Sequence, residues 1–320
     1  MASRPRKSAD LRRRVRLSQL ELLAALNRAP TLSAADREVN LSQPAASRLL
    51  NTLAADLAID LFERAGRTLR PTPAGRALLE RAAGLMSELD RAQSELEAIG
   101  AGFTGTVAVG AGVGAGDVLV PQALTLLHAD APGIAVALEE GPMENLSGKL
   151  REGRIDLLVG RIDATLLTPQ LTVDDLYNPP TAVVCGPRHP LARRGKIGFD
   201  EIVAHEWILP ARGTPMRGGL DILFRRLRYQ PERCLIESSS IQTNVALLNK
   251  RPLLWVVSGD IADYFVGLGL LKILPLPALK GPAPLVAAYR RDRALSVAAK
   301  RLLQAFHRAS ETIRAAAKPD

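Results

Sequence analysis

The sequence predicts a chain with two dissimilar parts: an all-α head that carries a short two-stranded wing, and an α/β domain built as two lobes. Three observations support this prediction. The first 75 of the 320 residues hold 13 basic and 7 acidic side chains, whereas the rest of the chain is close to neutral. An apolar heptad pattern follows the head, and helical and strand patterns alternate beyond it. With 47% hydrophobic residues, a chain of this length can build more than one core.

The head is preceded by a basic segment. Residues 1–15 contain three consecutive arginines and are expected to form a disordered tail. Apolar residues then recur at helical spacing in three short segments, at 17–27, 32–39 and 43–57. The last two segments are separated by only three residues, which is the turn length of a helix-turn-helix.

The third helix has clear start signals. Ser42 is placed to cap it, and Pro44 falls within its first turn, where a missing N–H costs nothing. Two strand patterns, at 61–64 and 68–72, then predict a wing. We therefore expect a winged helix-turn-helix domain over residues 16–72.

The exposed face of the third helix gives the strongest local evidence for DNA binding. A recognition helix buries one face and presents short polar and basic side chains near its N-terminus. The residues expected to face the core are Ala45, Leu49, Leu50 and Leu53. The residues expected to face DNA are Gln43, Pro44, Ser47 and Arg48. Three arginines of the wing could reach phosphates or a narrow minor groove: Arg64, Arg67 and Arg70. An ordinary solvated helix face would carry similar residues, so the helix by itself leaves both interpretations open.

A long linker helix is predicted over residues 73–99. Its apolar residues recur at spacings of four and three, the a/d pattern of a coiled coil: Leu78, Ala82, Leu85, Leu89, Ala92, Leu96 and Ile99. Such a helix is roughly 40 Å long at 1.5 Å per residue, too long to pack only on the head. We therefore expect it to form a dimer, and an amphipathic helix that lies on its own domain is the alternative.

Residues 100–105 are expected to form a hinge, and an α/β pattern follows. Strands are predicted at 106–110, 134–140, 155–160, 181–185, 207–210, 234–238, 253–258 and 284–290. Helices are predicted at 117–129, 143–153, 218–229, 241–250, 260–266 and 294–315. Alternation of this kind is typical of parallel sheets. The expected lobes are 106–180 with 276–320, and 181–275.

The composition argues against several other classes of protein. Two cysteines and four scattered histidines predict neither a disulfide framework nor a metal site. Residues 17–26 are too polar for an export signal, and residues 261–279 contain charges and prolines that a membrane-spanning helix rarely accepts. A cytoplasmic protein with no membrane partner is therefore expected.

An alternating run of glycines over 110–116 resembles a dinucleotide-binding turn only superficially. The pattern G-x-G-x-x-G needs a glycine where Ala115 or Asp117 stands. No catalytic triad or pair of carboxylates stands out elsewhere, so no catalytic residue, cofactor or enzymatic activity is expected. An NAD-linked enzyme and a plain solute-binding protein without specific DNA binding remain as alternatives.

Three motifs of the head resemble the N-terminal signature of LysR-type transcriptional regulators: S-Q-P-A-A-S-R at 42–48, L-F-E-R at 61–64 and R-P-T-P-A-G at 70–75. The resemblance implies DNA contact by Gln43, Pro44, Ser47 and Arg48, supported by Arg64. Two residues depart from the family pattern. Asp36 stands where a small apolar residue is usual, so it would need a partner such as Arg37 or a place at a polar rim. Ala58 replaces a common glycine.

Three motifs of the second part are similar to the effector domain of a LysR subgroup that regulates galactose-binding-protein genes and aromatic-acid catabolism. They are G-R-I-D-L-L-V-G-R at 153–161, H-P-L-A-R at 189–193 and W-I-L-P-A-R-G-T-P at 207–215. The resemblance implies an α/β two-lobed, periplasmic-binding-protein-like effector domain behind an N-terminal all-α winged helix-turn-helix. The implied partners are double-stranded DNA, a sugar-like or aromatic-catabolism effector, and RNA polymerase. The resemblance also implies that the chain pairs with a second copy of itself and that dimers assemble into a tetramer.

The family's effector site lies between the lobes. Ligands of open α/β sheets bind beyond the carboxyl ends of strands, at helix N-termini. The residues placed there are Gly114, Asp117, Arg212, Thr214, Ser239 and Ser240. Asp117 would repel an anion and accept hydrogen bonds from hydroxyls, which favours a neutral or polyhydroxylated ligand. Asp117 could equally cap its own helix.

Overall fold

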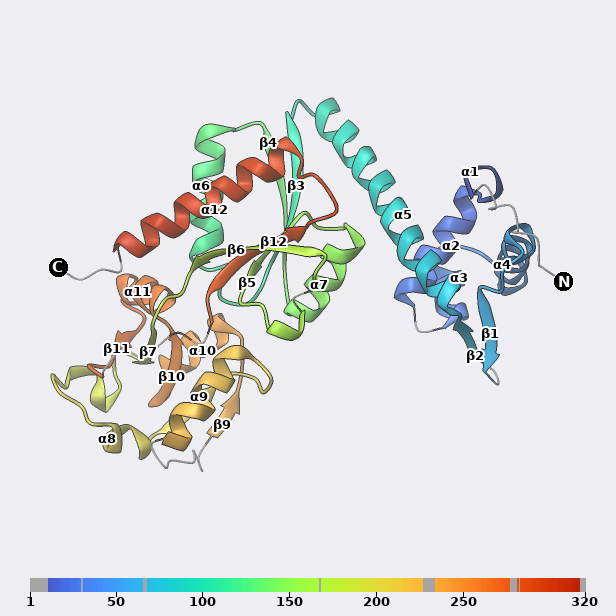
Figure 1. Ribbon diagram of the computed structural model, residues 1–320. Helices are drawn as coiled ribbons and strands as arrows, with labels where there is room; N and C mark the ends of the chain where they lie inside the picture. The colour runs from blue at the N-terminus through green and yellow to red at the C-terminus, as the bar shows by residue number, and fades with distance from the viewer. Residues whose placement is uncertain are drawn as a thin grey trace. The chain divides into compact units, whose positions relative to one another are not determined.

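The computed structural model describes residues 11–29, 31–65, 68–166, 168–226, 234–276, 281 and 283–316 (Figure 1). The chain divides into two compact units, one comprising the chain up to Glu97 with Arg151–Arg154 and the other comprising the rest. We call the part up to Glu97 the head and the part from Ala98 the effector domain. In the described part of the chain, no helix is both long enough and apolar enough to cross a membrane.

The head contains five helices and the wing among its described residues. The elements are α1 (Leu11–Arg14), α2 (Leu17–Arg28), α3 (Leu32–Glu38), α4 (Gln43–Leu57), β1 (Phe62–Ala65), β2 (Thr68–Pro71) and α5 (Pro73–Gly100). The core is made of leucines and alanines from α2, α3, α4 and the first turns of α5. Thr72 joins the wing to α5, because its hydroxyl donates to the Asp60 carbonyl at 2.8 Å and accepts from the Gly75 amide at 3.1 Å.

Helical structure is present in the head earlier in the chain than the sequence indicated. Helix α1 lies inside the segment that was expected to be disordered, while residues 1–10 lie outside the described residues. The Arg14 guanidinium donates to the Asp56 carbonyl near the end of α4, and Val15 packs against the head core. These contacts fix α1, so a basic composition did not prevent order here.

Helix α4 begins at Gln43 as predicted, but two details differ. Ser42 is its N-cap residue, yet its side chain makes no capping hydrogen bond. The fully buried alanine is Ala46, and Ala45 is only half-buried. The reason is the 3.6-residue period, which places Ala46, Leu50 and Leu53 in one stripe facing the core.

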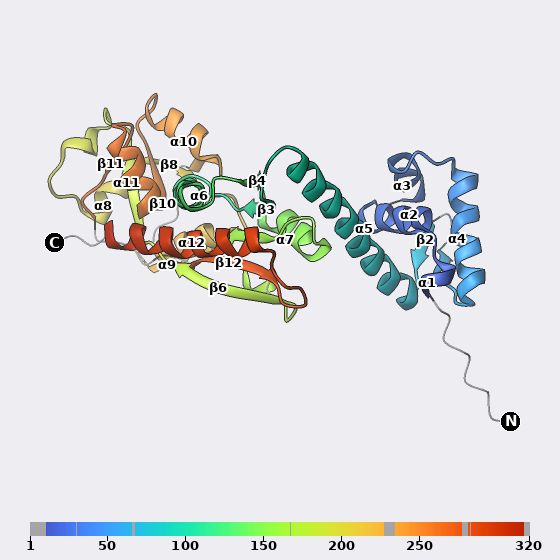
Figure 2. The same cartoon turned by 90° about the horizontal axis from the view of Figure 1, so that it is seen from above.

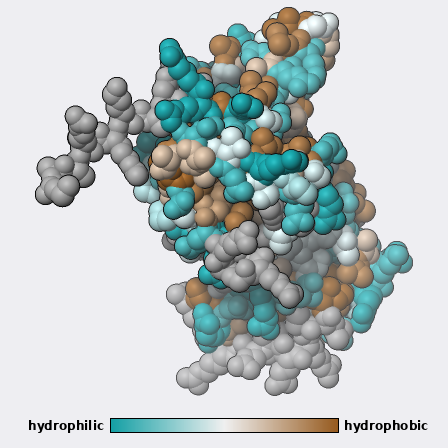
Figure 3. Space-filling view, turned by 90° about the vertical axis from the view of Figure 1, so that its right-hand side faces the viewer, coloured by the Kyte–Doolittle hydropathy of each residue, from teal (hydrophilic) through white to brown (hydrophobic). Residues whose placement is uncertain are grey.

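Helix α5 divides into a packed half and an exposed half. Leu79 and Ala82 are buried in the head core, which is the arrangement expected of a helix lying on its own domain. Farther along, Leu85 is 52% exposed and Leu96 71% exposed. Hydrophobic side chains reach the surface at several separate places on the face drawn in Figure 3, so exposure alone does not indicate an interface. The regular heptad spacing of these leucines is the more specific feature.

The effector domain contains two five-stranded sheets, one in each lobe. Lobe 1 has the strand order β4-β3-β5-β12-β6 and lobe 2 has the order β11-β7-β10-β8-β9. The strands of lobe 1 are β3 (Gly105–Ala111), β4 (Ile134–Glu140), β5 (Leu157–Gly160), β6 (Leu171–Tyr177) and β12 (Leu285–Arg290). The strands of lobe 2 are β7 (Thr181–Cys185), β8 (Glu206–Leu209), β9 (Cys234–Glu237), β10 (Leu253–Ser258) and β11 (Lys272–Ile273).

Both sheets are mixed, so the prediction of parallel sheets was wrong. Strands β3, β4 and β5 are parallel to one another, as are β8, β9 and β10. Strand β12 is antiparallel to β5 and β6, and β7 is antiparallel to β10. The chain crosses into lobe 2 just before β7 and returns just before β12. Each of these strands therefore enters its sheet from the side of the other lobe, which reverses its direction.

Helices cover both faces of each sheet. In lobe 1, α6 (Leu119–Asp130) and α12 (Val297–Ala316) pack side by side on one face and α7 (Met143–Glu152) packs on the other (Figure 2). In lobe 2, α8 (Phe199–Val203) and α9 (Pro215–Arg226) contribute to one core, and α10 (Ile241–Leu248) and α11 (Gly259–Gly267) contribute to the other. The N-termini of α7, α9, α10 and α11 all lie near the space between the lobes.

Candidate functional site

The N-terminal part of α4 presents the residues predicted to contact DNA. Gln43, Pro44 and Arg48 are exposed, and Ser47 is half-buried. The Arg48 Nε donates to the Pro44 carbonyl at 3.2 Å, so this side chain lies along its own helix. The turn before α4 is tight because Asn40 adopts the left-handed region at φ 54°.

The wing can be described only in part. Arg64 lies on β1, but its side chain falls outside the described part of the structure, and Arg67 lies outside the described residues. Arg70 is exposed on β2 and is the register partner of Glu63. An acidic neighbour across the strands offsets some of the positive charge that Arg70 brings to this edge.

Asp36 in α3 has neither of the surroundings that would make its departure from the family pattern harmless. Its side chain is only 3% exposed, and both carboxylate oxygens lack a hydrogen-bond partner among the described residues. Burial raises its pKa above the ordinary value, because the charged form loses its hydration. The Asp36 carboxylate therefore stands neither at a polar rim nor in a described hydrogen bond.

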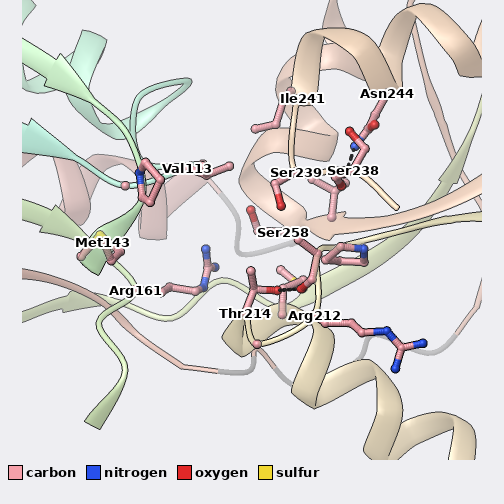
Figure 4. A pocket seen from close by; sticks show the side chains of 18 of the residues that line it. Val113, Met143, Arg161, Arg212, Thr214, Ser238, Ser239, Ile241, Asn244 and Ser258 are labelled. Carbon is pink, nitrogen blue, oxygen red and sulfur yellow. Dashed lines mark hydrogen bonds between the residues drawn. The ribbon is translucent and has the colours of Figure 1, made fainter. Parts of the chain in front are cut away.

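A cavity of about 410 Å³ lies between the two lobes of the effector domain (Figure 4). Its walls come from the segments that follow β3, β4, β5, β8 and β9 and from the end of β10. Within each lobe these strands are parallel, so their carboxyl ends meet at the cleft, as expected for ligand sites of α/β sheets. Part of the lining is apolar, including Val113, Met143, Ile241, Trp255 and Ile261.

Four of the six residues predicted to contact the effector line this cavity: Gly114, Arg212, Thr214 and Ser239. Gly114 has φ +89°, a conformation that favours glycine. The Thr214 hydroxyl is engaged locally, since it donates to the Ala211 carbonyl at 2.7 Å and accepts from the Arg217 amide at 3.3 Å. The Arg212 side chain is 81% exposed and points away from the cavity toward Glu237.

The other two predicted residues do not belong to the cavity lining. The Ser240 hydroxyl caps α10 by accepting from the Thr243 amide at 3.3 Å. Asp117 does not cap α6, whose N-cap is Val118. The pKa of Asp117 is raised by burial and by the neighbouring charges of Glu140 and Asp260. Asp117 thus belongs to an acidic group beside the cavity.

Arg161 is the main lining residue that the sequence analysis did not identify. Its Nε donates to the Ala283 carbonyl at 3.1 Å, while its Nη2 is buried and lacks a hydrogen-bond partner among the described residues. Burial lowers the pKa of this guanidinium, although Asp260 and Tyr177 act in the opposite direction. A signal was present in the sequence, because Arg161 follows the buried strand L-L-V-G directly.

Two further polar residues of lobe 2 line the cavity. Asn244 is fully buried on α10; its Nδ2 donates weakly to the Ser238 carbonyl at 3.5 Å and its Oδ1 has no partner in the described structure. Ser258 ends β10, and its side chain projects toward the same space as Arg161 (Figure 4). The cavity therefore combines an apolar wall with a few polar groups, as ligand pockets commonly do.

The glycines of the first loop serve packing. A side chain at Gly112 would lie 2.4 Å from the Met143 sulfur, and one at Gly116 would lie 2.0 Å from a Glu140 oxygen. The loop is therefore close to α7 and to the end of β4, and its glycines are explained without a dinucleotide. No group of three metal-ligating side chains occurs in the described ranges.

Comparison with known proteins gives matches over nearly the whole chain. Residues 17–76 match the model of the bacterial regulatory helix-turn-helix protein, lysR family, and residues 100–311 match the LysR substrate binding domain. The HTH-type transcriptional regulator GbpR of Azospirillum brasilense is 30% identical over 303 residues, covering 94% of this chain and 89% of that protein.

Two solved structures share the fold. A full-length OxyR variant from Pseudomonas aeruginosa has a TM-score of 0.58 and 21% identity, with 94% of this chain and 95% of that chain covered. Full-length CbnR complexed with its target DNA has a TM-score of 0.57 and 18% identity, with 92% and 100% covered. With both family models matched, the chain belongs to the LysR family and is a DNA-binding transcription regulator with an effector-binding domain.

Proposed function

We propose that this regulator reads its operator through the N-terminal part of α4, with Gln43, Pro44, Ser47 and Arg48 directed into the major groove. The observation that supports this proposal is that α4 has one buried and one exposed face. Ala46, Leu50 and Leu53 are buried, whereas Gln43, Pro44 and Arg48 are exposed. Gln and Arg side chains can form bidentate contacts with bases. The wing arginines Arg64, Arg67 and Arg70 would add phosphate or minor-groove contacts.

The proposal includes a dimer formed through the exposed half of α5. Two heads in a dimer bind two half-sites, so pairing of α5 would set the spacing that the operator must have. Family membership further supports assembly of dimers into a tetramer, a cytoplasmic location and contact with RNA polymerase, and we include these in the proposal.

The effector would bind in the cavity between the lobes. A ligand changes the output only if it binds one arrangement of the lobes more tightly than the other, and a coupling of about 1–3 kcal/mol is typical. No step of this mechanism requires a chemical reaction. The cavity would thus convert the concentration of a small molecule into a change in DNA binding.

A gel-shift titration on the DNA upstream of the protein's own gene tests this function. We expect a discrete complex that resists non-specific competitor and weakens with salt, with a slope of about −5 in log–log form if about 6 phosphates are neutralised. Gln43→Ala should weaken binding and relax sequence preference, whereas Gln93→Ala on the exposed surface of α5 should match the wild type. If folded, dimeric protein selects no sequence even from random DNA, the proposed function is wrong.

A further inference from the structure

We propose that the ligand of the interlobe cavity is an organic acid whose carboxylate pairs with the guanidinium of Arg161. This inference rests on the proposal that the cavity is the effector site. It replaces the neutral or polyhydroxylated ligand that the sequence analysis favoured on account of Asp117, since Asp117 does not line the cavity.

The first argument is the unused hydrogen-bonding capacity of Arg161. A guanidinium has five N–H donors in a planar fork that matches a carboxylate, and it stays charged in proteins. Here one donor, Nε–H, reaches the Ala283 carbonyl, while Nη2 is buried without a partner among the described residues. Leaving a buried charged donor unpaired is costly, so a complementary anion would relieve a penalty already built into the ligand-free site.

The second argument is that the protein's own acids do not satisfy Arg161. Asp260 influences its pKa, but the Oδ2 atom of Asp260 accepts from the Tyr177 hydroxyl at 2.5 Å, and its Oδ1 atom is also buried without a partner in the described structure. Two acids line the cavity, and both are exposed: Glu144 and Asp163. The Asp163 carboxylate accepts from the backbone and hydroxyl of Thr165, at 2.9 and 2.7 Å.

The third argument is the direction of the surrounding helix dipoles. The cavity is lined by residues from the first turn or N-cap of α7, α9, α10 and α11: Met143, Thr214, Ile241 and Ser258. The N-terminus of a helix carries a partial positive charge and unpaired N–H groups, both of which favour anions. Ser239 and Ser258 also project toward the space that Arg161 faces (Figure 4).

The chemistry favours a carboxylate over a doubly charged phosphate. Of the two lining arginines that the structure describes, Arg212 is turned outward to Glu237, which leaves Arg161 as the arginine directed at the cavity. One guanidinium with hydroxyl groups suits a single negative charge. The apolar wall of Val113, Ile241 and Ile261 suits the carbon skeleton of a small acid.

Matched pairs of acid and neutral analogue provide the test, with full-length protein at constant ionic strength. The probes are benzoate and benzamide, 4-hydroxybenzoate and 4-hydroxybenzamide, succinate and succinamide, and galacturonate and galactose, with inorganic phosphate as a plain anion. Binding is measured by thermal shift and then by calorimetry. We expect at least one acid to raise the melting temperature while its neutral partner and phosphate do not.

Variants then assign the effect to Arg161. Arg161→Gln should weaken binding of that acid at least tenfold, and Arg161→Lys should weaken it less because the charge remains. Arg225→Gln is the matched control, since it removes an exposed arginine of α9 that does not line the cavity, and it should bind the acid within twofold of wild type. The lysine variant keeps the test decisive if the glutamine variant does not fold.

Three results would overturn the assignment: equal binding of acids and their neutral analogues, unchanged acid binding in folded Arg161→Gln, or no acid binding more tightly than phosphate. Gel shifts on the same preparations separate this failure from failure of the proposed function. Protein that selects its operator but prefers neutral compounds is a regulator with another ligand class. Protein that binds acids but selects no DNA contradicts the regulator function instead.

Discussion

The Tyr177 hydroxyl donates a 2.5 Å hydrogen bond to the Asp260 carboxylate, joining the end of β6 in lobe 1 to the first turn of α11 in lobe 2. Both side chains are buried. Burial and the neighbouring Asp260 charge raise the pKa of Tyr177, so the phenol keeps its proton and remains a donor at all ordinary pH values. The two lobes are therefore joined by a polar contact as well as by the chain.

Removing this contact should destabilise the effector domain. Tyr177→Phe leaves the Asp260 carboxylate buried with neither oxygen hydrogen-bonded, and we expect a loss of about 1–3 kcal/mol in the free energy of unfolding. Urea unfolding measures the change. Tyr264→Phe is the matched control, because Tyr264 is an exposed tyrosine of α11, the helix that carries Asp260. Equal stability of Tyr177→Phe and wild type would show that the bond contributes nothing net.

Asp36 is expected to lower the stability of the head. Replacing its buried, unpartnered carboxylate with alanine should raise the free energy of unfolding by roughly 1–3 kcal/mol at pH 7. The folded-state pKa is raised, so the penalty is absent near pH 4 and grows as the pH rises through the folded pKa. Melting curves at pH 4.5 and 7 should show a gain that is larger at pH 7. Asp56→Ala, at an exposed acid of α4, should change stability by less than about 0.5 kcal/mol.

Ala58 is the C-cap of α4 in the left-handed conformation, at φ 51°. A residue with a Cβ atom costs about 1 kcal/mol more there than glycine does. Ala58→Gly should therefore raise the melting temperature of the head. Ala55→Gly, three residues earlier inside the same helix, should lower the melting temperature, because glycine inside a helix costs a similar free energy. A loss of stability in both variants would mean that the left-handed cap is not strained.

The burial of His189 predicts that lobe 2 is less stable at acidic pH. Burial lowers its pKa to about 4, with a smaller contribution from the His205 ring, whose centroid lies 4.8 Å away. The contribution of neutral His189 to the free energy of unfolding is fully present above the unfolded pKa of about 6.5. It is lost as the pH falls from there toward 4, by up to about 1.4 kcal/mol per pH unit. His189→Asn retains an acceptor for the Leu191 amide and should flatten melting temperature against pH between 7 and 5. An unchanged slope would assign the acid sensitivity to other groups.

The exposed half of α5 predicts the oligomeric state. Leu89→Glu with Leu96→Glu places charge on the heptad seam, and we expect light scattering to detect a tenfold or greater rise in the dimer dissociation constant. Gln93→Lys adds a charge at an exposed polar position of that half, where it can pair with Glu97, and should leave the dimer intact. A dimer that survives the double change would place the interface elsewhere.

Local pattern was sufficient for the helices whose apolar stripes are long. The periodicity over 43–57 and 73–99 predicted α4 and α5 to within a residue, because one buried face dictates the spacing. Strand β6 was missed, and its sequence explains why. Asp174 and Asp175 indicate a loop, but β6 lies at the edge of its sheet, where acidic residues are tolerated.

Strand direction and the state of Arg161 depend on distant parts of the chain. Whether β12 runs parallel to β5 is decided by where the chain returns from lobe 2, which local spacing does not encode. The one described hydrogen-bond partner of Arg161 is a carbonyl 122 residues away, at Ala283. The position of Arg161 directly after a strand was therefore only a partial signal, since its unpaired state depends on these distant contacts.

Tyr177 and Leu285 are register partners on adjacent antiparallel strands, although more than a hundred residues separate them in the sequence. All of lobe 2 thus occupies the position of a hairpin loop in lobe 1, and a short turn joining these two residues would close the first sheet without it. Replacing lobe 2 between these two residues would therefore change one wall of the interlobe cavity and leave the strand pairing of lobe 1 in place.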